Sequence, residues 1–256
     1  SYWILFKIIL NFLSLYKRQL LYYLKKKIDI DADKLGRNFS LENLLIKYGS
    51  DKASFWSKKK NGHGYTKYYL KHLQKFKYKK INILEIGSYA GASASAFSKF
   101  FPNSKIYCLD INISNFKYSS KKIKVFGLDA AKKNSASSFF KKINISLNQK
   151  YFDIIIDDGS HKLGDMLNTL RFFFNSLKSN GFYIIEDYTQ MNFFRHLRVA
   201  KEPNFDKIIS CLKKKKFFNT QFLELNFQKK LFSEIKQIKY YKGLSKISSI
   251  VFFKKY

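Results

Sequence analysis

Cysteine, proline and methionine are scarce in this sequence, with two of each among 256 residues. Two cysteines cannot form a disulfide framework, so we expect the chain to work in a reducing compartment, the cytoplasm. Acidic residues are also few, because 18 Asp and Glu stand against 49 Lys and Arg, which gives a net charge of +31. Hydrophobic residues make up 46% of the chain. That fraction excludes a wholly disordered protein, and the length suits one large α/β domain or such a domain with a small addition.

The excess of positive charge attracts phosphate groups and anionic lipid surfaces. A base composition that favours codons for Lys, Ile, Asn, Phe and Tyr explains the same excess, and the 27 Phe and 18 Tyr fit that bias. The lysines occur in scattered pairs and triplets, as on solvated faces, and no RNA-recognition or base-stacking motif accompanies them. We therefore do not expect nucleic acid to be the partner.

The first segment, residues 1–37, is predicted to be an amphipathic helix followed by a polar linker. Lys7, Asn11, Ser14 and Arg18 repeat at spacings of four, three and four, which places them on one side of a helix beside a broad apolar face. The apolar run is shorter than the roughly 20 residues that span a bilayer, and its order of charges is unlike that of a secretory signal. Three interpretations stay open: packing on the main domain or a second subunit, peripheral contact with the inner face of the membrane, or a spanning anchor.

Two further segments complete the expected organisation. Residues 38–80 are predicted to be a helical cap, in which Ser40 caps a helix and Gly49 ends it. Residues 81–256 are predicted to be the main domain, because short apolar runs alternate there with helical patterns. This alternation predicts an α/β fold with a doubly wound, mostly parallel sheet.

The expected strands of this domain are short and apolar. They are residues 81–86, 105–109, 123–126, 152–156 and 182–185. Helices are predicted at residues 92–100 and 163–177, with Asn180-Gly181 as the cap of the second helix. A C-terminal antiparallel hairpin of residues 232–241 and 247–253 is expected at the edge of the sheet. Ligands of such sheets bind beyond the carboxyl ends of the strands, where acidic residues gather in this sequence.

The turn after the first of these strands is expected to bind a nucleoside. It spans residues 85–91 and has the spacing GxxxG, which differs from the GxGxxG of dinucleotide-binding turns. Tyr89 in that turn disfavours a pyrophosphate, whereas S-adenosylmethionine has no phosphate and needs an acid and free backbone amides. We expect Asp110 to bind the ribose hydroxyls and Asp129 to meet the adenine amino group. The predicted cofactor-binding residues here are Glu85, Gly87, Ser88, Gly91, Asp110 and Asp129.

A second acidic cluster follows the fourth and fifth strands. Asp158, Glu186 and Asp187 should converge there, and three close carboxylates repel one another unless a cation is present. Oxygen ligands favour a hard divalent ion such as Mg²⁺ or Mn²⁺. Asp157 is the reserve ligand, because adjacent strand residues point to opposite faces. His161 is the expected general base and forms the catalytic pair with Asp158, the alternative being a structural role in capping or packing.

Several strings of the sequence are distinctive when they are taken together. They are Lys47-Tyr48-Gly49-Ser50-Asp51-Lys52, His63-Gly64-Tyr65-Thr66, Tyr68-Tyr69, Ile83-Leu84-Glu85-Ile86-Gly87, Ile155-Ile156-Asp157-Asp158-Gly159-Ser160-His161 and Ile185-Glu186-Asp187-Tyr188. This set resembles the metal-dependent sugar O-methyltransferases, which methylate deoxysugars of macrolides and related natural products. The resemblance covers about residues 47–188.

The resemblance implies a Rossmann-like class I methyltransferase, which moves a methyl group from S-adenosylmethionine to a sugar hydroxyl with the help of Mg²⁺, often as a homo-oligomer. It implies that Asp158, Glu186 and Asp187 bind the metal and that His161 is the base. It also places further residues near the cofactor, namely Tyr48, Ser50, His63, Tyr65 and Thr66. For these, a structural role in turns is the alternative.

We expect the acceptor to be a sugar of a bacterial surface glycan or its nucleotide-sugar precursor. Two alternatives remain: an RNA or DNA methyltransferase, which the charge favours, and a non-catalytic cofactor-binding protein of the same fold. Residues 189–226 contain no readable code for the substrate.

Overall fold

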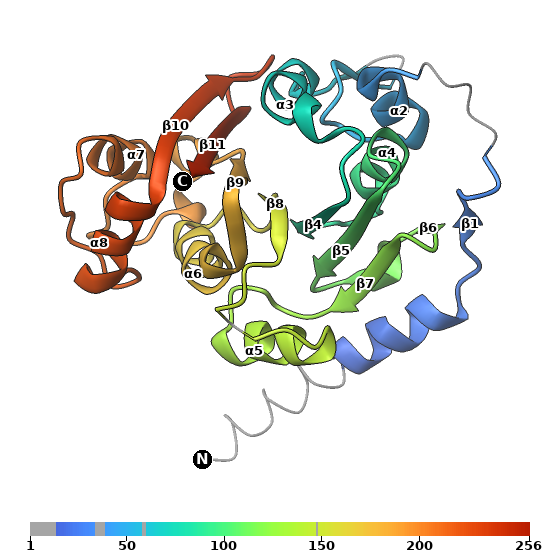
Figure 1. Cartoon of the computed structure of the whole chain (residues 1–256), viewed down its shortest axis with the longest axis horizontal. Coiled ribbons are helices and arrows are strands. Elements are labelled where there is room, and N and C mark those ends of the chain that lie inside the picture. Colours follow the sequence, from blue (N-terminus) through green and yellow to red (C-terminus); the bar gives the residue numbers. More distant parts are fainter. Residues whose placement is uncertain (1–13, 34–38, 58–59, 147) are drawn as a thin grey trace.

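The computed structural model describes residues 14–33, 39–57, 60–146 and 148–256. At its centre is a seven-stranded sheet with the strand order β10-β11-β9-β8-β4-β5-β7 (Figure 1). The parallel part consists of β4 (Ile81–Ile86), β5 (Ser104–Asp110), β7 (Ile123–Gly127), β8 (Phe152–Asp157) and β9 (Leu177–Glu186). The antiparallel part is the hairpin of β10 (Ile235–Lys242) and β11 (Ser249–Lys255). The predicted α/β sheet with a C-terminal hairpin is confirmed.

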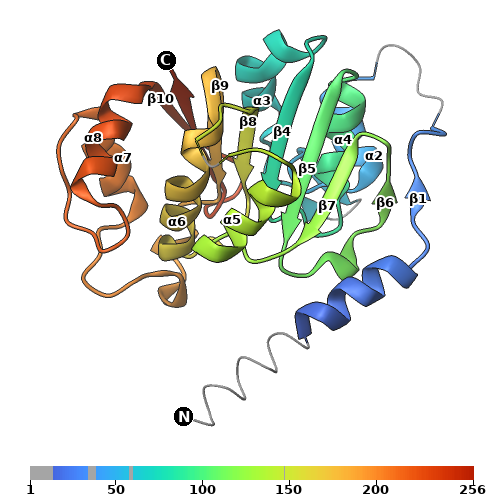
Figure 2. The same ribbon diagram turned by 60° about the horizontal axis from the view of Figure 1, so that its bottom comes forward.

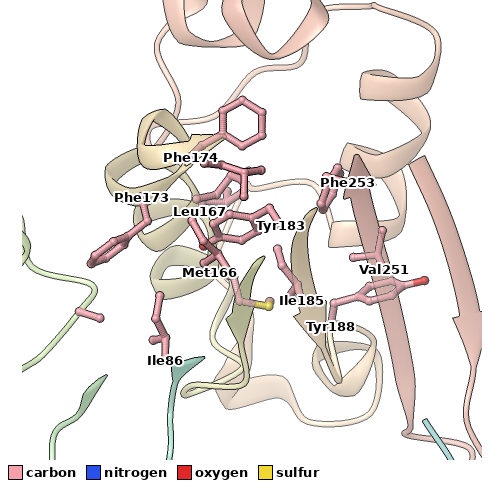
Figure 3. Close-up of a cluster of buried hydrophobic side chains, with 14 of the residues drawn as sticks. Ile86, Met166, Leu167, Phe173, Phe174, Tyr183, Ile185, Tyr188, Val251 and Phe253 are labelled. Carbon is pink, nitrogen blue, oxygen red and sulfur yellow. The ribbon is translucent and has the colours of Figure 1, made fainter. Parts of the chain in front are cut away.

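Helices cover both faces of the sheet, and each face has its own hydrophobic core (Figures 1 and 2). The helices on one face are α2 (Leu41–Tyr48), α3 (Thr66–Leu73) and α4 (Ala92–Phe100). Those on the other face are α5 (Lys133–Lys142), α6 (Leu163–Phe173), α7 (Phe205–Lys213) and α8 (Leu225–Glu234). Apolar residues recur in α6 at spacings of three and four, so Met166, Leu167 and Phe173 share its buried side and belong to the same cluster as Tyr183 and Ile185 of β9 (Figure 3).

Shorter elements connect these layers. Two small pairs of strands are β1 (Ile28–Asp29) with β6 (Tyr118–Ser119), and β2 (Phe55–Ser57) with β3 (Lys60–Asn61). The 3₁₀ turns are η1 (Gln74–Phe76), η2 (Ile113–Asn115), η3 (Phe174–Ser176), η4 (Gln190–Asn192) and η5 (Arg195–Leu197). The predicted ends of α2 are confirmed: the Ser40 hydroxyl accepts a hydrogen bond from the Asn43 amide at 3.1 Å, and Gly49 takes the left-handed conformation with φ 78°.

The N-terminal segment is helical from residue 14 to residue 24. Two members of the predicted polar stripe, Lys7 and Asn11, lie outside the described residues. The expected polar linker contains β1, which pairs in parallel with β6 and so ties this segment to the main domain. None of the helices in the described part of the chain has both the length and the hydrophobicity that crossing a bilayer requires.

Two predicted boundaries are wrong. The pair Asn180-Gly181 lies inside β9 and does not cap the preceding helix, because buried Leu177 already pairs with Phe152 of β8 and starts the strand. Asn180 takes a φ of 60°, and the register shifts before Phe182 pairs with β8. The first strand of the hairpin starts at Ile235 rather than at residue 232, since α8 continues to Glu234.

Candidate functional site

The acidic residues singled out in the sequence lie along the carboxyl edge of the parallel strands. Glu85 lies near the end of β4, Asp110 ends β5, and Glu186 ends β9. Asp129 follows β7, and Asp158 follows β8. Because β4 lies between β8 and β5, this edge brings the two predicted clusters next to each other.

Glycines make the turn after β4 closely packed. Gly87 has a φ of 82°, and a Cβ at this position would lie 2.0 Å from the Asp158 carbonyl oxygen. Gly91 has a φ of 76°, and a Cβ there would lie 2.4 Å from the ring of Phe116. A side chain would therefore be strained at both positions and would push the turn away from its neighbours. Ser88 is buried, and its hydroxyl donates to the Glu85 carbonyl oxygen at 3.2 Å.

Glu85 is fully buried, yet one of its carboxylate oxygens is unpaired. Ser93 of α4 donates a hydrogen bond to Oε1, whereas Oε2 has no hydrogen-bond partner among the described residues. Burial raises the pKa of Glu85 to about 7. A buried oxygen without a donor is costly, so this carboxyl group is suited to a ligand that brings an N–H group.

A pocket of about 480 Å³ opens between the ends of β4, β5, β7 and β8. Asp110 and Asp129 both line it, together with Gly87, Asp158 and Ser160. Backbone amides fix the two acids, because Tyr89 donates to Asp110 Oδ2 at 2.7 Å and Ala131 donates to Asp129 Oδ1 at 3.1 Å. The pocket therefore presents oriented carboxylates, as a ligand with hydroxyl and amino groups requires.

Beside this pocket lies a group of three potential metal ligands. Asp158, His161 and Asp187 each offer one ligand atom, and these atoms lie within 4.8 Å of one another. The His161 Nε2 atom is 3.9 Å from Asp158 Oδ1. His161 and Asp187 have φ values of 56° and 53°, which are rare for residues with a side chain. Strained backbone of this kind gathers at functional sites, where the surrounding structure must hold it.

The structure places a lysine in this cluster, and sequence analysis had given it no role. Lys52 is 1% exposed, and its Nζ atom forms ion pairs with Asp158 Oδ2 and, at 2.9 Å, with Glu186 Oε2. Burial alone would lower the pKa of Lys52, but the carboxylates of Asp158 and Glu186 hold it well above its usual value. Lysine is almost never fully buried without such partners, so Lys52 is a built-in cation of the site.

Tyrosines and a histidine complete the surroundings of the acids. Tyr65 donates its hydroxyl hydrogen to Asp187 Oδ1, and Tyr69 donates to Glu186 Oε1. Burial and these carboxylates raise the pKa values of both tyrosines, so both stay protonated donors. His63 Nδ1 is 3.6 Å from Asp187 Oδ1; burial alone would lower the pKa of His63, but Asp51 and Asp187 raise it to about 9.

The charges of this cluster do not balance. With every group ionised, the acids Asp51, Asp158, Glu186 and Asp187 outnumber the two cations, Lys52 and His63, by two. Burial and the nearby Asp158 carboxylate raise the pKa of Glu186 to about 8, so without an ion this carboxyl group takes up a proton. A divalent ion beside Asp158 and Asp187 would neutralise the remainder, and carboxylate oxygens are the ligands that Mg²⁺ and Mn²⁺ prefer. The donor set of the site therefore fits such an ion.

The predicted ligands do not all face the same point. Lys52 and Tyr69 each form a hydrogen bond with one of the two carboxylate oxygens of Glu186. The side chain that lies beside Asp158 and Asp187 is that of His161. The role of Glu186 as a ligand therefore stays a prediction. Asp157, the reserve ligand, points to the other side of the sheet, where Thr169 of α6 donates to its Oδ2 atom.

The upstream residues that the resemblance placed near the cofactor lie elsewhere in this structure. None of Tyr48, Ser50, His63, Tyr65 and Thr66 lines the pocket that contains Asp110 and Asp129. Tyr65 and His63 instead contact Asp187, which belongs to the group of three potential metal ligands. Tyr48 donates to Asp33, the Ser50 hydroxyl accepts from the Lys52 amide, and the Thr66 hydroxyl is buried without a partner in the described chain. A role of these residues at the cofactor thus stays a prediction.

Three polar contacts of the site were not predicted from the sequence, and they are made by Lys52, Tyr69 and Ser93. Lys52 and Tyr69 stand in the strings that carry the family resemblance, which was the one available signal. Ser93 lies in the first turn of α4, where its small side chain reaches back to Glu85.

Comparison with known proteins identifies relatives of this chain. No family model matches it. The L-olivosyl-oleandolide 3-O-methyltransferase of Streptomyces antibioticus is 32% identical over 154 residues, which are 57% of this chain and 36% of that protein. The mycinamicin VI 2''-O-methyltransferase of Micromonospora griseorubida is 28% identical over 160 residues, which are 59% of this chain and 36% of that protein. The homologues of this chain are deoxysugar O-methyltransferases. The chain spans little more than a third of the length of these deoxysugar O-methyltransferases.

Solved structures show the fold. The MycE methyltransferase of the mycinamycin pathway was solved with Mg and SAH, and its alignment with this protein covers 86% of this chain and 55% of the MycE chain. The TM-score is 0.64, and the sequence identity is 20%. The alignment with a ribosomal RNA methyltransferase from Plasmodium falciparum covers 75% of this chain and 95% of that methyltransferase, with a TM-score of 0.50 and 16% identity. The chain shares with these proteins the Rossmann-like fold of class I methyltransferases, and the fold by itself does not distinguish a sugar from an RNA acceptor.

Proposed function

We propose that this protein is an S-adenosylmethionine-dependent and divalent-metal-dependent O-methyltransferase that acts on a sugar hydroxyl. The observation that carries the proposal is the position of the Asp158, His161 and Asp187 cluster directly beside the pocket of Asp110 and Asp129. Gly87 is in close contact with the Asp158 backbone, so the cofactor pocket and the metal cluster share one wall. The deoxysugar O-methyltransferases among the relatives support the same reaction.

Two carboxyl groups that line the pocket, and the neighbouring buried carboxyl group of Glu85, are the cofactor ligands that we propose. Asp110 accepts hydrogen bonds from the ribose hydroxyls, as acids at the end of the second strand do in nucleoside-binding sheets. The unpaired Oε2 atom of Glu85 accepts from the amino group of the methionine part. Asp129 faces the adenine amino group from the other wall of the pocket.

The acceptor hydroxyl meets the metal cluster. A divalent ion bound there would act as a Lewis acid and would lower the pKa of the sugar hydroxyl group. Asp158 and Asp187 would hold that ion, and Lys52 and Tyr65 fix the orientation of these two carboxylates. His161 takes the hydroxyl proton on an imidazole nitrogen, and the acceptor oxygen then attacks the methyl carbon in line with the departing sulfur.

Glu85→Gln is expected to weaken cofactor binding by about tenfold to a hundredfold, because the neutral amide loses a charge-assisted hydrogen bond to the ammonium group. The side chain keeps its shape and its contact with Ser93, so the fold should persist. Calorimetric titration with SAH measures the change. An affinity equal to that of the wild type would place the cofactor away from Glu85.

Asp187→Asn is expected to lower the affinity for Mn²⁺ or Mg²⁺ at least about tenfold, because one of the two carboxylates that hold the ion becomes neutral. The amide oxygen still accepts the Tyr65 hydroxyl bond, so the loss is specific to the ion. Metal titration by calorimetry measures it, with Asp129→Asn as the matched control on the far wall of the pocket. Equal metal affinity in wild type and Asp187→Asn would refute this assignment.

The acceptor that we propose is a sugar of a bacterial surface glycan or its nucleotide-activated precursor. The relatives methylate glycosylated natural products according to their names, which supports a glycoside as the acceptor class. The net charge of +31 suits a substrate that carries phosphate. The homo-oligomer implied by the resemblance is part of this proposal, and light scattering of the purified protein tests it.

Incubation with labelled S-adenosylmethionine, Mg²⁺ and a panel of glycosides and nucleotide sugars tests the function. We expect one acceptor to gain one methyl group by mass, and a chelator to abolish the gain. Methyl transfer at full rate in the chelator would contradict the metal-dependent mechanism. RNA is the second acceptor to include, because an RNA methyltransferase shares the fold and the chain is strongly basic. Methylation of RNA, with tight binding that falls steeply as salt rises, would replace the sugar in the proposal.

A further inference from the structure

The N-terminal helix of residues 14–24 shows its apolar side chains to solvent. Tyr16, Leu20, Tyr23 and Leu24 lie at spacings of three and four on one side of the helix, and Leu21 is next to them. Tyr23 is 76% exposed and Leu24 is 73% exposed, and the other three are exposed as well. We call these five residues the outer face.

The opposite side of this helix faces the protein through polar contacts. The Arg18 guanidinium donates to the Ile111 carbonyl oxygen at 3.2 Å, and the Gln19 amide donates to the Gly127 carbonyl oxygen at 3.1 Å. Helices on the surface of a soluble protein normally turn their apolar stripe inward. On the inner side Tyr22 packs against Phe116, but the five apolar side chains of the outer face stay exposed, so among the described residues this face lacks the partner that hydrophobic burial would favour.

Charge identifies the partner. Lys17 is exposed next to the outer face, and Lys25 and Lys26 are exposed where the helix ends. A second copy of the chain would bring the same three lysines against this face, so local charge opposes a dimer through it. An anionic lipid surface attracts both the lysines and the whole chain, and it accepts leucine and tyrosine side chains at the boundary between head groups and acyl chains.

We propose that residues 14–24 bind the surface of a bilayer that contains anionic lipid, with the outer face in the interface. The helix is held at the ends of β5 and β7, the same edge that carries the ligand pocket (Figure 2). Ile111, whose carbonyl oxygen accepts from Arg18, also lines that pocket. Membrane binding therefore keeps the ligand edge of the sheet close to the lipid surface.

Vesicle flotation with the full chain tests the proposal. Wild-type protein should float with vesicles of phosphatidylcholine and phosphatidylglycerol and much less with phosphatidylcholine alone. The double variant Leu20→Glu with Leu24→Glu should lower the bound fraction at least about tenfold, because two leucines that enter the lipid interface become charged. Lys25→Gln with Lys26→Gln should weaken binding to the anionic vesicles by about fivefold for each lysine removed.

The control is Leu225→Glu, which places one such charge at an exposed leucine in the first turn of α8, away from the outer face. It should float as the wild type does, and circular dichroism should show all variants folded. Binding that the double leucine variant retains, or binding that ignores lipid charge, would overturn the proposal. The face would be assigned to a second copy if the wild-type protein does not float and light scattering shows a dimer for the wild type but a monomer for the double leucine variant.

Discussion

Replacing Lys52 by methionine is expected to lower the free energy of unfolding by about 3–5 kcal/mol when a chelator is present. The Lys52 ammonium group lies between Asp158 and Glu186 and is 1% exposed. Methionine fills most of the same volume but leaves the buried carboxylate of Glu186 and the partly buried carboxylate of Asp158 without their counter-charge. Breaking a buried ion pair from one side is costly for this reason, whereas the loss of packing is small. Urea denaturation measures the change.

The control for Lys52 is a lysine whose ion pair is partly exposed to solvent. Lys230 is 3.7 Å from Glu234 on the surface of α8, and Lys230→Met should change stability by less than about 1 kcal/mol. Added Mg²⁺ should stabilise Lys52→Met more than it stabilises the wild type, because the ion restores positive charge beside Asp158. A destabilisation of Lys52→Met as small as that of Lys230→Met would mean that the buried ion pair does not form in solution.

Replacing His161 by alanine is expected to lower kcat by about 10²-fold to 10⁴-fold, the usual contribution of a general base. His161 lies beside Asp158 but is not among the residues that line the pocket of Asp110 and Asp129. The affinity for SAH should therefore stay within about twofold of the wild type. Single-turnover rates and calorimetric titration of the same variant separate the two effects.

The pH profile distinguishes a base from a structural histidine. If His161 is the base, the pH dependence of the rate in the wild type should differ from that in His161→Ala, which has no side chain to take the proton. His161→Gln keeps much of the size and polarity of the side chain, so it should be as slow as alanine if proton removal is what is lost. A rate for His161→Gln close to that of the wild type, or equal losses of rate and SAH affinity in alanine, would identify a structural role.

The strands and acidic ends of this fold follow from local sequence. Apolar runs such as residues 81–86 are short and end in turn residues, so they predict parallel strands and their order of connection. Once the sheet is parallel, its acidic ends must share one edge, and this places Asp158 near Asp187 without further information.

The cation inside the site could not be read from the sequence. Lys52 meets Asp158 and Glu186 across 106 and 134 residues of chain, and the string that contains it indicates the family but not this contact. Tyr65 was expected near the cofactor, but its partner Asp187 is 122 residues away. The segment before β4 packs on the sheet through such distant contacts. Its sequence strings, residues 47–52 and 63–66, therefore indicated that the segment belongs to a site, but not which ligand of the site its side chains lie near.

The central claim is that a divalent ion binds at Asp158 and Asp187 next to a cofactor pocket bounded by Asp110. Anomalous scattering from crystals grown with Mn²⁺ and SAH tests it most directly. The account predicts one strong peak within about 2.5 Å of oxygen atoms of both Asp158 and Asp187, with the SAH ribose on Asp110. A manganese peak elsewhere, or SAH bound away from the Asp110 pocket, would contradict it.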